Sequence, residues 1–348
     1  MHILQIVSAK QMNGVIAHLR LLIPALRARG HRVSIVARDG SPFVEEFAAI
    51  ASDLSRSPAT ELNRIAQFCK EQKVDVIHAH MSRANNFATR LKRLTGLPCV
   101  LTAHALVWHP HWRQADRVLA VSEATARWHR LWNRVPANRI ETILNFVDPA
   151  RLTPGPDARQ RLRTEWGADE SELLLGTVGD IIKRKGHDVL IPALEKAPGF
   201  RLVVIGKGDA AFVDPLKKRA GDRALWLGAR RDIPDILSAL DGFVLASRQD
   251  PCPMAVIEAM ATGLPVVGSR VDGIPEFVDE GLCGFLARPS DPNDLARALG
   301  CLVALTPETR LRMGAYCREF IQNHATPEVQ VPKIEAALQS VLKTSTRE

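Results

Sequence analysis

The sequence predicts an α/β protein built from two doubly wound domains, each with a parallel sheet. Its 348 residues are too many for one ordinary hydrophobic core and suit two domains of about 150 to 200 residues. Short apolar runs, typical of buried strands, alternate with longer amphipathic runs, typical of helices, in both halves of the chain. The predicted domains cover residues 1–150 and 151–328.

The first half opens with a strand, a loop, a helix and a second strand, which is the repeating unit of a parallel sheet. The predicted strands are 2–7, 31–36, 74–80, 98–102 and 117–121, and the first helix spans about 15–29. Ligands of such sheets bind beyond the carboxyl ends of the strands. Gly14 lies at the start of the first helix, where its backbone could approach a phosphate or a sugar. An ordinary loop glycine explains it equally well.

Three histidines lie at or near strand ends in this half. His78 and His80 belong to the predicted strand 74–80, where hydrogen-bonded structural histidines are at least as good an interpretation as functional ones. His104 follows the strand 98–102, at an end where it could meet a hydroxyl of a ligand.

A second strand-loop-helix unit begins at Leu173. The predicted strands are 173–179, 201–206, 225–227 and 242–246, and the strand after the last helix of this group begins near 265. The loop between the first strand and its helix contains Lys183-Arg184-Lys185-Gly186, which offers cations and backbone amides to an anion. Gly206-Lys207-Gly208 is a weak match to a phosphate loop.

The most informative stretch is 245–268, which reads as strand, loop, helix and strand. Its helix is predicted over 253–262, because a proline suits the first turn and Gly263 suits the residue past the end. Glu258 is the only charged residue of this helix, and Asp250 precedes it by eight positions. Carboxylates together with helix N-terminal amides suit the hydroxyls of a sugar or ribose. A helix acid that caps a neighbouring loop is the simpler alternative.

These residues resemble the donor-site signature of the GT4 family of glycosyltransferases. The resemblance is carried by Ser247, Asp250, Pro253, Glu258-Ala-Met-Ala, Gly263 and Pro265-Val-Val, and it spans nearly the whole chain. It implies a GT-B fold, in which two Rossmann-like domains face a cleft and the last helix, about 329–345, packs back on the first domain. The implied reaction is retaining, metal-independent transfer of a sugar from a nucleotide-diphosphate sugar.

The resemblance also assigns roles to individual residues. Asp250 is expected to contact the transferred sugar and Glu258 the ribose, while Lys185 contacts the diphosphate and His104 lies near the sugar. The remaining donor-binding residues carried over are Gly14, Pro253, Met254 and Ala255. We expect no metal or other cofactor, since the sequence lacks a cation-binding DxD motif.

The sequence departs from the family pattern at three positions. Asp180 stands where the family has an arginine beside the diphosphate, Ile16 where it has a glutamate, and Asp250 where glutamate is usual. Asp180 would repel the leaving group, or it would pair with Lys183 or Arg184 and so aim Lys185 at the phosphates. A glycosyltransferase is the preferred function. A GT-B epimerase, a polysaccharide synthase and a non-catalytic nucleotide-sugar-binding protein remain alternatives.

The positive charge is concentrated in the first half of the chain. Residues 1–150 contain 20 Lys and Arg against 11 Asp and Glu, whereas the rest contains 26 against 27. Four of the six tryptophans, at 108, 112, 128 and 132, fall among arginines in this half. This mixture suits a membrane interface, and equally the edge of a core with a solvated rim. We therefore expect a glycan or lipid-linked acceptor and peripheral contact with an anionic membrane.

Several classes of protein are disfavoured. There is no apolar run long enough for a membrane span and no signal-peptide pattern at the start, so a cytoplasmic protein is expected, peripheral on the inner face of the membrane. The six cysteines show no metal-ligand spacing. No nucleophile elbow, HExxH motif or P-loop occurs, and no RNA-binding signature accompanies the tryptophans, so nucleic acid is not an expected partner.

Overall fold

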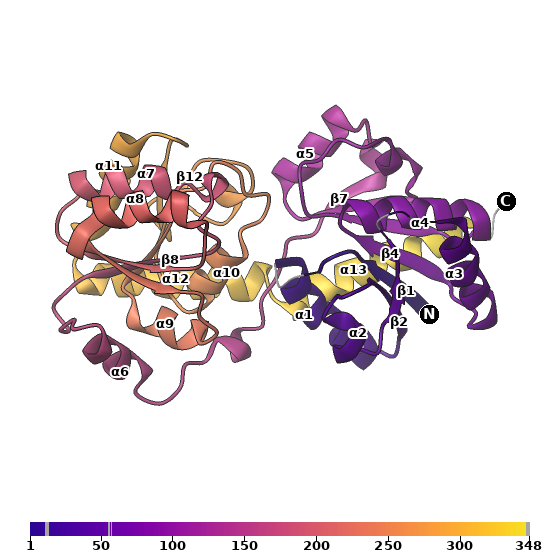
Figure 1. The fold of residues 1–348 in the computed structure, drawn as a ribbon, viewed down its shortest axis with the longest axis horizontal. Coiled ribbons are helices and arrows are strands. Elements are labelled where there is room, and N and C mark those ends of the chain that lie inside the picture. Colours follow the sequence, from indigo (N-terminus) through magenta and orange to yellow (C-terminus); the bar gives the residue numbers. More distant parts are fainter. Residues whose placement is uncertain (11–13, 55, 57, 346–348) are drawn as a thin grey trace. The chain divides into compact units, whose positions relative to one another are not determined.

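The computed structural model describes residues 1–10, 14–54, 56 and 58–345, and the chain forms two compact units. Unit 1 consists of Met1–Phe146 and Pro327–Glu348, and unit 2 of Val147–Thr326. Each unit is a parallel sheet with interleaved helices (Figure 1), which confirms the predicted fold class. The division falls after Phe146 rather than after residue 150.

Unit 1 contains the strands β1 to β7 and the helices that connect them. The strands are β1 His2–Val7, β2 Arg32–Arg38, β3 Ile50–Ser52, β4 Val76–His80, β5 Cys99–Ala103, β6 Arg117–Ala120 and β7 Ile140–Thr142. The helices are α1 Gly14–Ala28, α2 Phe43–Glu46, α3 Ala59–Glu71, α4 Ser82–Thr95, α5 Glu123–Trp132 and α13 Pro327–Ser345, with 3-10 turns η1 Pro110–Gln114 and η2 Ala137–Arg139.

Unit 2 contains the strands β8 to β13. They are β8 Leu174–Val178, β9 Arg201–Ile205, β10 Ala224–Gly228, β11 Gly242–Leu245, β12 Val266–Ser269 and β13 Gly284–Ala287. The helices are α6 Ala158–Glu165, α7 His187–Lys196, α8 Ala210–Ala220, α9 Ile233–Ala239, α10 Met254–Ala261, α11 Pro292–Val303 and α12 Pro307–His324. Short 3-10 turns complete the unit: η3 Pro149–Leu152, η4 Lys183–Lys185, η5 Gly221–Arg223 and η6 Ile274–Glu276.

The strand order reverses once in each sheet. Unit 1 has the order β3-β2-β1-β4-β5-β6-β7, and unit 2 the order β10-β9-β8-β11-β12-β13. The reversal lies between β1 and β4 in unit 1 and between β8 and β11 in unit 2. In open α/β sheets the loops at this point diverge to opposite faces and leave a crevice that binds ligands. The loops after β8 and β11 therefore form the expected ligand site of unit 2.

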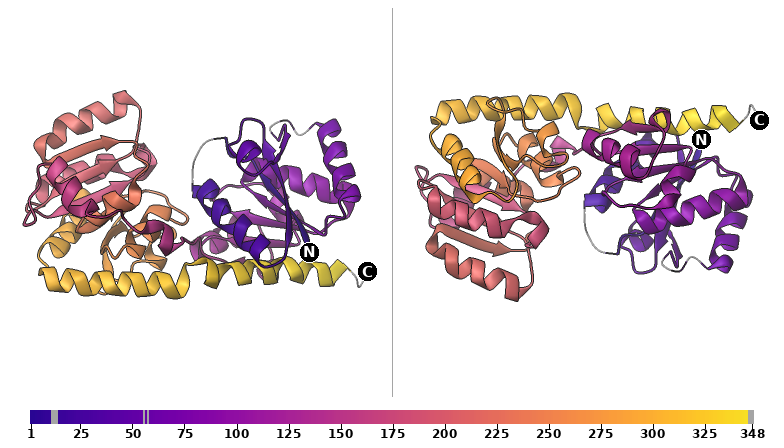
Figure 2. Two further views of the ribbon diagram at one scale, coloured as in Figure 1. Left: turned by 90° about the horizontal axis from the view of Figure 1, so that it is seen from below. Right: turned by 90° about the horizontal axis from the view of Figure 1, so that it is seen from above.

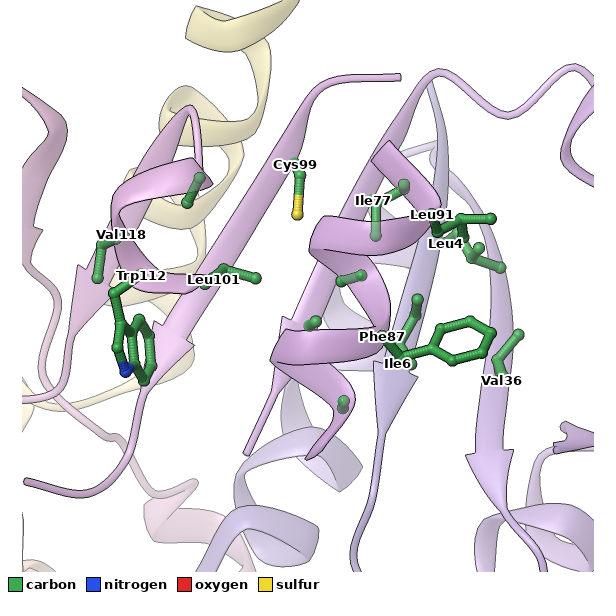
Figure 3. Packing of buried hydrophobic residues seen from close by; sticks show 14 of the residues in the cluster. Leu4, Ile6, Val36, Ile77, Phe87, Leu91, Cys99, Leu101, Trp112 and Val118 are labelled. Atoms are coloured by element: carbon green, nitrogen blue, oxygen red, sulfur yellow. The ribbon is translucent and has the colours of Figure 1, made fainter. Parts of the chain in front are cut away.

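Side chains of β1 alternate between the two faces of the unit 1 sheet. Leu4 and Ile6 pack with Phe87 and Leu91 of α4 (Figure 3), whereas Ile3 and Val7 pack on the opposite face. The central strand is buried on both faces, as its unbroken apolar run indicates. Because α4 is fixed by this core, its other face is left for different contacts.

Helix α13 belongs to unit 1 although it comes last in the sequence. Its residues Val331, Ile334 and Leu338 join the core that contains α1, and Glu335 pairs with Arg29 and His31. Figure 2 shows α13 in yellow alongside α1. Among the helices that the structure describes, none combines the length and the apolar character that a bilayer span requires.

Candidate functional site

Two loops meet at the strand-order reversal of unit 2. The first follows β8 and contains η4, and the second follows β11 and leads into α10. Gly186 ends the first loop with φ of +72°, and a Cβ at this position would lie 1.9 Å from the carbonyl oxygen of Ala246. Only glycine permits so close an approach together with this backbone conformation. Gly186 therefore lets the cationic turn η4 pack against the end of β11.

Hydrogen bonds join the same two loops. The amide of Arg248 donates to the carbonyl of Arg184 at 2.8 Å. The Arg184 guanidinium donates in turn to the carbonyl of Gln249, also at 2.8 Å. Arg248 donates to the Asp188 carboxylate at 2.6 Å, which ties the second loop to α7. These contacts fix the positions of Lys185 and Asp250 relative to one another.

Lys185 and Asp250, both expected at the donor site, form an ion pair. The Lys185 Nζ lies 2.6 Å from Asp250 Oδ2, and the two side chains are 15% and 7% exposed. Ser247 Oγ donates to the same carboxylate oxygen at 3.3 Å. The pair is thus sheltered from solvent, where its geometry is held more firmly than that of a surface pair.

Asp272 also belongs to this group, although no role was predicted for it. Its carboxylate accepts the amide of Asp250 at 2.8 Å, and its φ is +46°. Burial, followed by the charge of Asp250, raises the pKa of the Asp272 carboxyl. The only signal in the sequence is that Asp272 precedes Gly273 shortly after the donor-site stretch, which does not by itself indicate a functional residue.

Glu258 lies on α10, which is one residue shorter at each end than the predicted helix, because Pro253 is its N-cap and Thr262 its C-cap. Its side chain is half-buried and has no hydrogen-bond or ion-pair partner among the residues that the structure describes. Burial raises its pKa from 4.5 to about 7. A desolvated carboxylate without donors is unfavourable until a ligand supplies them. Met254 and Ala255 form the first turn of α10, where amides have no intrahelical acceptor.

The alternative proposed for Asp180, a pairing with Lys183 or Arg184, is wrong. Asp180 is exposed and forms no ion pair with any described residue. Arg184 instead donates to Gln249, and Lys185 is oriented by Asp250. The lysine is therefore positioned from the second loop and not from within its own loop.

Gly206 and Gly208 have a structural explanation. A Cβ on Gly206 would lie 1.9 Å from the carbonyl oxygen of Gly179, and one on Gly208 would lie 2.3 Å from that of Ile181. The Ile181 amide donates to the carbonyl of Lys207 at 2.8 Å. The two glycines therefore allow the loop after β9 to support the loop after β8.

In unit 1 a chain of hydrogen bonds ends at His104. The Gln5 amide nitrogen donates to His78 Nδ1 at 3.1 Å, and His78 Nε2 lies 2.8 Å from Thr102 Oγ1. The Gln5 amide oxygen accepts from His80 Nε2 at 2.9 Å, and His80 Nδ1 lies 3.1 Å from His104 Nε2. His80 Nδ1 is thus an acceptor, so His104 Nε2 carries the proton and His104 Nδ1 carries a lone pair.

These imidazoles are neutral near pH 7. Burial lowers the pKa of His78 to about 3 and that of neighbouring His18 to about 4. Burial, reinforced by the nearby histidines, also holds the pKa of His80 and His104 well below the ordinary value. His78 and His80 are fully buried, whereas His104 is partly exposed at the carboxyl end of β5.

The remaining predicted positions in unit 1 lie at the start of α1. Gly14 is the first residue of α1 and is exposed. Ile16, which stands in place of a glutamate in the family pattern, is fully buried in the core with α13. Asn13 lies outside the described residues. Of the two predicted positions described at this helix start, Gly14 is exposed and Ile16 is not.

The tryptophans between 108 and 132 do not share one environment. Trp112 is 2% exposed and packs near Leu101 and Val118 (Figure 3), so for this residue the core is the correct one of the two interpretations. Trp128 is half-buried. Trp108 and Trp132 are each 63% exposed, and Leu131 is 67% exposed. Trp108, Trp132 and Leu131 are together called the aromatic patch below.

The sequence matches two family models. Residues 12–151 match Glycosyltransferase Family 4, and residues 172–304 match Glycosyl transferases group 1. The chain is 27% identical over 294 residues to the UDP-Gal:alpha-D-GlcNAc-diphosphoundecaprenol alpha-1,3-galactosyltransferase of Escherichia coli. The aligned region covers 76% of this chain and 75% of that protein. It is 26% identical over 354 residues to the N-acetyl-alpha-D-glucosaminyl L-malate synthase of Bacillus anthracis, which covers 91% of both.

Solved structures agree with this assignment at the level of the fold. The crystal structure of Anabaena HepE in complex with UDP superimposes with a TM-score of 0.86 at 21% identity, over 98% of this chain and 100% of that one. Matches to both halves, whole-length relatives and a shared architecture all point to one group of enzymes. The chain belongs to glycosyltransferase family 4 and has the GT-B fold.

Proposed function

We propose that this glycosyltransferase moves a sugar from a nucleotide-diphosphate sugar to a glycan, lipid-linked or lipopolysaccharide-type acceptor, with retention and without a metal. The observation that carries the proposal is the arrangement at the reversal of the unit 2 sheet. A sheltered lysine is paired with Asp250, and Glu258, eight positions later in the sequence, receives no hydrogen bond from any residue that the structure describes. This set offers a cation to a diphosphate and carboxylates to sugar hydroxyls.

Each residue then has a distinct task. Lys185 stabilises the negative charge that develops on the departing diphosphate, and Asp250 holds that lysine in place and accepts from a sugar hydroxyl. Glu258 accepts from the ribose hydroxyls. His104 presents its Nδ1 lone pair to a hydroxyl of the transferred sugar, because the bonds through Gln5 and His80 fix its tautomer.

The donor can be identified by a thermal-shift panel of nucleotide-sugars. A ligand at about 100 times its dissociation constant adds roughly 2.7 kcal/mol to the free energy of unfolding. We expect one nucleotide-sugar to raise the melting temperature, and its parent nucleoside diphosphate to do so as well. Should none of a broad panel produce a shift, donor binding at this site is refuted.

The acceptor is proposed to lie at the inner face of a membrane. The E. coli relative is named for a diphosphoundecaprenol-linked acceptor. In this chain the aromatic patch is accompanied by the exposed residues Arg127 and Arg134. Amphipathic indole rings beside cations suit the headgroup region of an anionic bilayer.

We expect Trp108→Ser/Trp132→Ser to lower the partition onto anionic liposomes at least tenfold at low ionic strength. Full burial of one large apolar side chain contributes about 1.5 to 3 kcal/mol, and 1.4 kcal/mol corresponds to a factor of ten. Liposome flotation measures the effect, with Leu282→Ser/Leu311→Ser as the matched control, since both leucines are exposed on unit 2. If the parent protein fails to float, a soluble acceptor is the better proposal.

A further inference from the structure

A polar cavity lies in unit 1, between α4 and η1. Its volume is about 440 Å³, and its lining contains Arg83, Arg90, Arg93, His109 and His111 but no acidic side chain. The arginines recur along one stripe of α4, because positions three and seven apart share a face of a helix. The adjoining face of α4, with Phe87 and Leu91, is fixed in the core (Figure 3). The stripe is therefore held in place by the packing beside it.

Two of the three arginines that line this cavity keep their positive charge unpaired within the part of the chain that the structure describes. Arg83 and Arg93 are exposed, and neither has an ion-pair partner among the residues that the structure describes. Lys92, on the neighbouring face of the same helix, is paired with Asp116. Asp116 therefore neutralises Lys92 and not the arginines that line the cavity.

A buried polar atom in the lining also lacks a partner. His111 is 5% exposed, and its Nε2 has no hydrogen bond among the described residues. The ring stacks on His109 with 5.0 Å between centroids, which limits its freedom to turn away. Leaving such an atom without a partner costs about 1 to 3 kcal/mol. The lining of the cavity therefore contains a buried ring nitrogen that the described residues leave unsatisfied.

The cavity adjoins the aromatic patch. The amide of His109 donates to Asn133 Oδ1 at 2.9 Å, and Asn133 Nδ2 donates to the carbonyl of Val107 at 3.0 Å. These bonds hold the segment around Trp108 against the end of α5, where Leu131 and Trp132 are exposed. A molecule with a charged head and an apolar tail would meet both features.

We infer that this cavity binds the phosphate or diphosphate group of the acceptor. Guanidinium groups match phosphate oxygens in bidentate geometry, and Arg90 and Arg93 lie one helical turn apart. The phosphate is carried either by a lipid or by a soluble phosphorylated sugar. The identity of the ligand as the acceptor rests on the proposed function, whereas anion binding by the cavity does not.

Titration of the full-length protein with inorganic pyrophosphate tests the inference. Arg83→Glu/Arg93→Glu should weaken binding at least tenfold, and Lys218→Glu/Arg312→Glu, an equal change of charge on exposed residues of unit 2, should not. Every protein in this titration, the parent included, also carries Lys185→Ala, so that the donor site contributes little to pyrophosphate binding. The milder Arg83→Gln/Arg93→Gln should give an intermediate affinity. Equal affinities in the parent and the glutamate variant, or equal losses in both glutamate pairs, would overturn the inference.

A second arm separates the two sources of phosphate. Phosphatidylcholine vesicles are prepared with and without farnesyl diphosphate. Capture of the protein by the doped vesicles, lost in Arg83→Glu/Arg93→Glu, supports a lipid carrier. Binding of pyrophosphate and sugar phosphates without capture supports a soluble one. Nucleotide-sugars should still raise the melting temperature of Arg83→Glu/Arg93→Glu. If no nucleotide-sugar raises the melting temperature of the parent protein, the proposed function is contradicted, whereas the result for the cavity stands.

Discussion

Lys185→Ala should lower the turnover of sugar transfer by about 10²-fold or more, the effect of losing one preorganised electrostatic donor. The lysine is sheltered and directed by Asp250 at 2.6 Å, so its charge needs no rearrangement when the diphosphate departs. Steady-state release of nucleoside diphosphate measures the loss. The melting temperature is recorded alongside, because the substitution also removes the partner of a buried carboxylate.

Asp180→Ala provides the matched control within the same loop. Its side chain is exposed and unpaired among the described residues, so we expect a change of less than tenfold, in either direction. A repulsive charge near the diphosphate is worth only about 1 kcal/mol when well screened. The account fails if Lys185→Ala transfers sugar as fast as the parent while Asp180→Ala is inactive.

Glu258→Gln should weaken nucleotide binding and yet stabilise the unliganded protein above neutral pH. Because burial raises the pKa from 4.5 to about 7, the folded protein retains a proton between those values that the unfolded chain releases. Stability of the parent therefore falls as the pH rises through this interval, and glutamine removes that slope. We expect the variant to gain about 2 kcal/mol at pH 8 relative to pH 5, from roughly 1.4 kcal/mol per pKa unit with allowance for partial exposure.

The same variant should lose about 1.5 to 3 kcal/mol of binding free energy for a nucleoside diphosphate, the scale of a charged hydrogen bond. Calorimetric titration and urea unfolding at the two pH values measure both effects. Asp250→Asn serves as the comparison, since we expect it chiefly to slow transfer. Unchanged nucleotide affinity in Glu258→Gln would show that the ribose contacts other residues.

Much of the fold was predictable because its signals are local. The helix α10 was predicted from a proline at its start and Gly263 past its end, and Gly263 has φ of +87°, a backbone conformation that glycine adopts without strain. The strand β1 was predicted with the observed bounds, since an apolar run between polar residues suffices to define it. Such features need no knowledge of the rest of the molecule.

The arrangement of the site was less predictable because it depends on contacts across the fold. The Lys185–Asp250 pair joins loops 65 positions apart and requires the close approach that Gly186 allows. Both residues were predicted from the sequence, but the pairing of Asp180 with Lys183 or Arg184, one of the two alternatives for that residue, is not found among the described residues. Trp108 and Trp112 lie four positions apart, yet one is exposed and the other buried, because Trp112 belongs to η1 and packs in the core with residues of the sheet.

Mass spectrometry of the reaction products tests the central claim most directly. The nucleotide-sugar with the largest thermal shift is incubated with the protein and a panel of lipid-linked and soluble glycan acceptors. The account predicts one nucleoside diphosphate released for each acceptor that becomes heavier by one sugar, with the reaction lost in Lys185→Ala. Epimerisation of the nucleotide-sugar, or its recovery intact with every acceptor, would contradict the proposed sugar transfer.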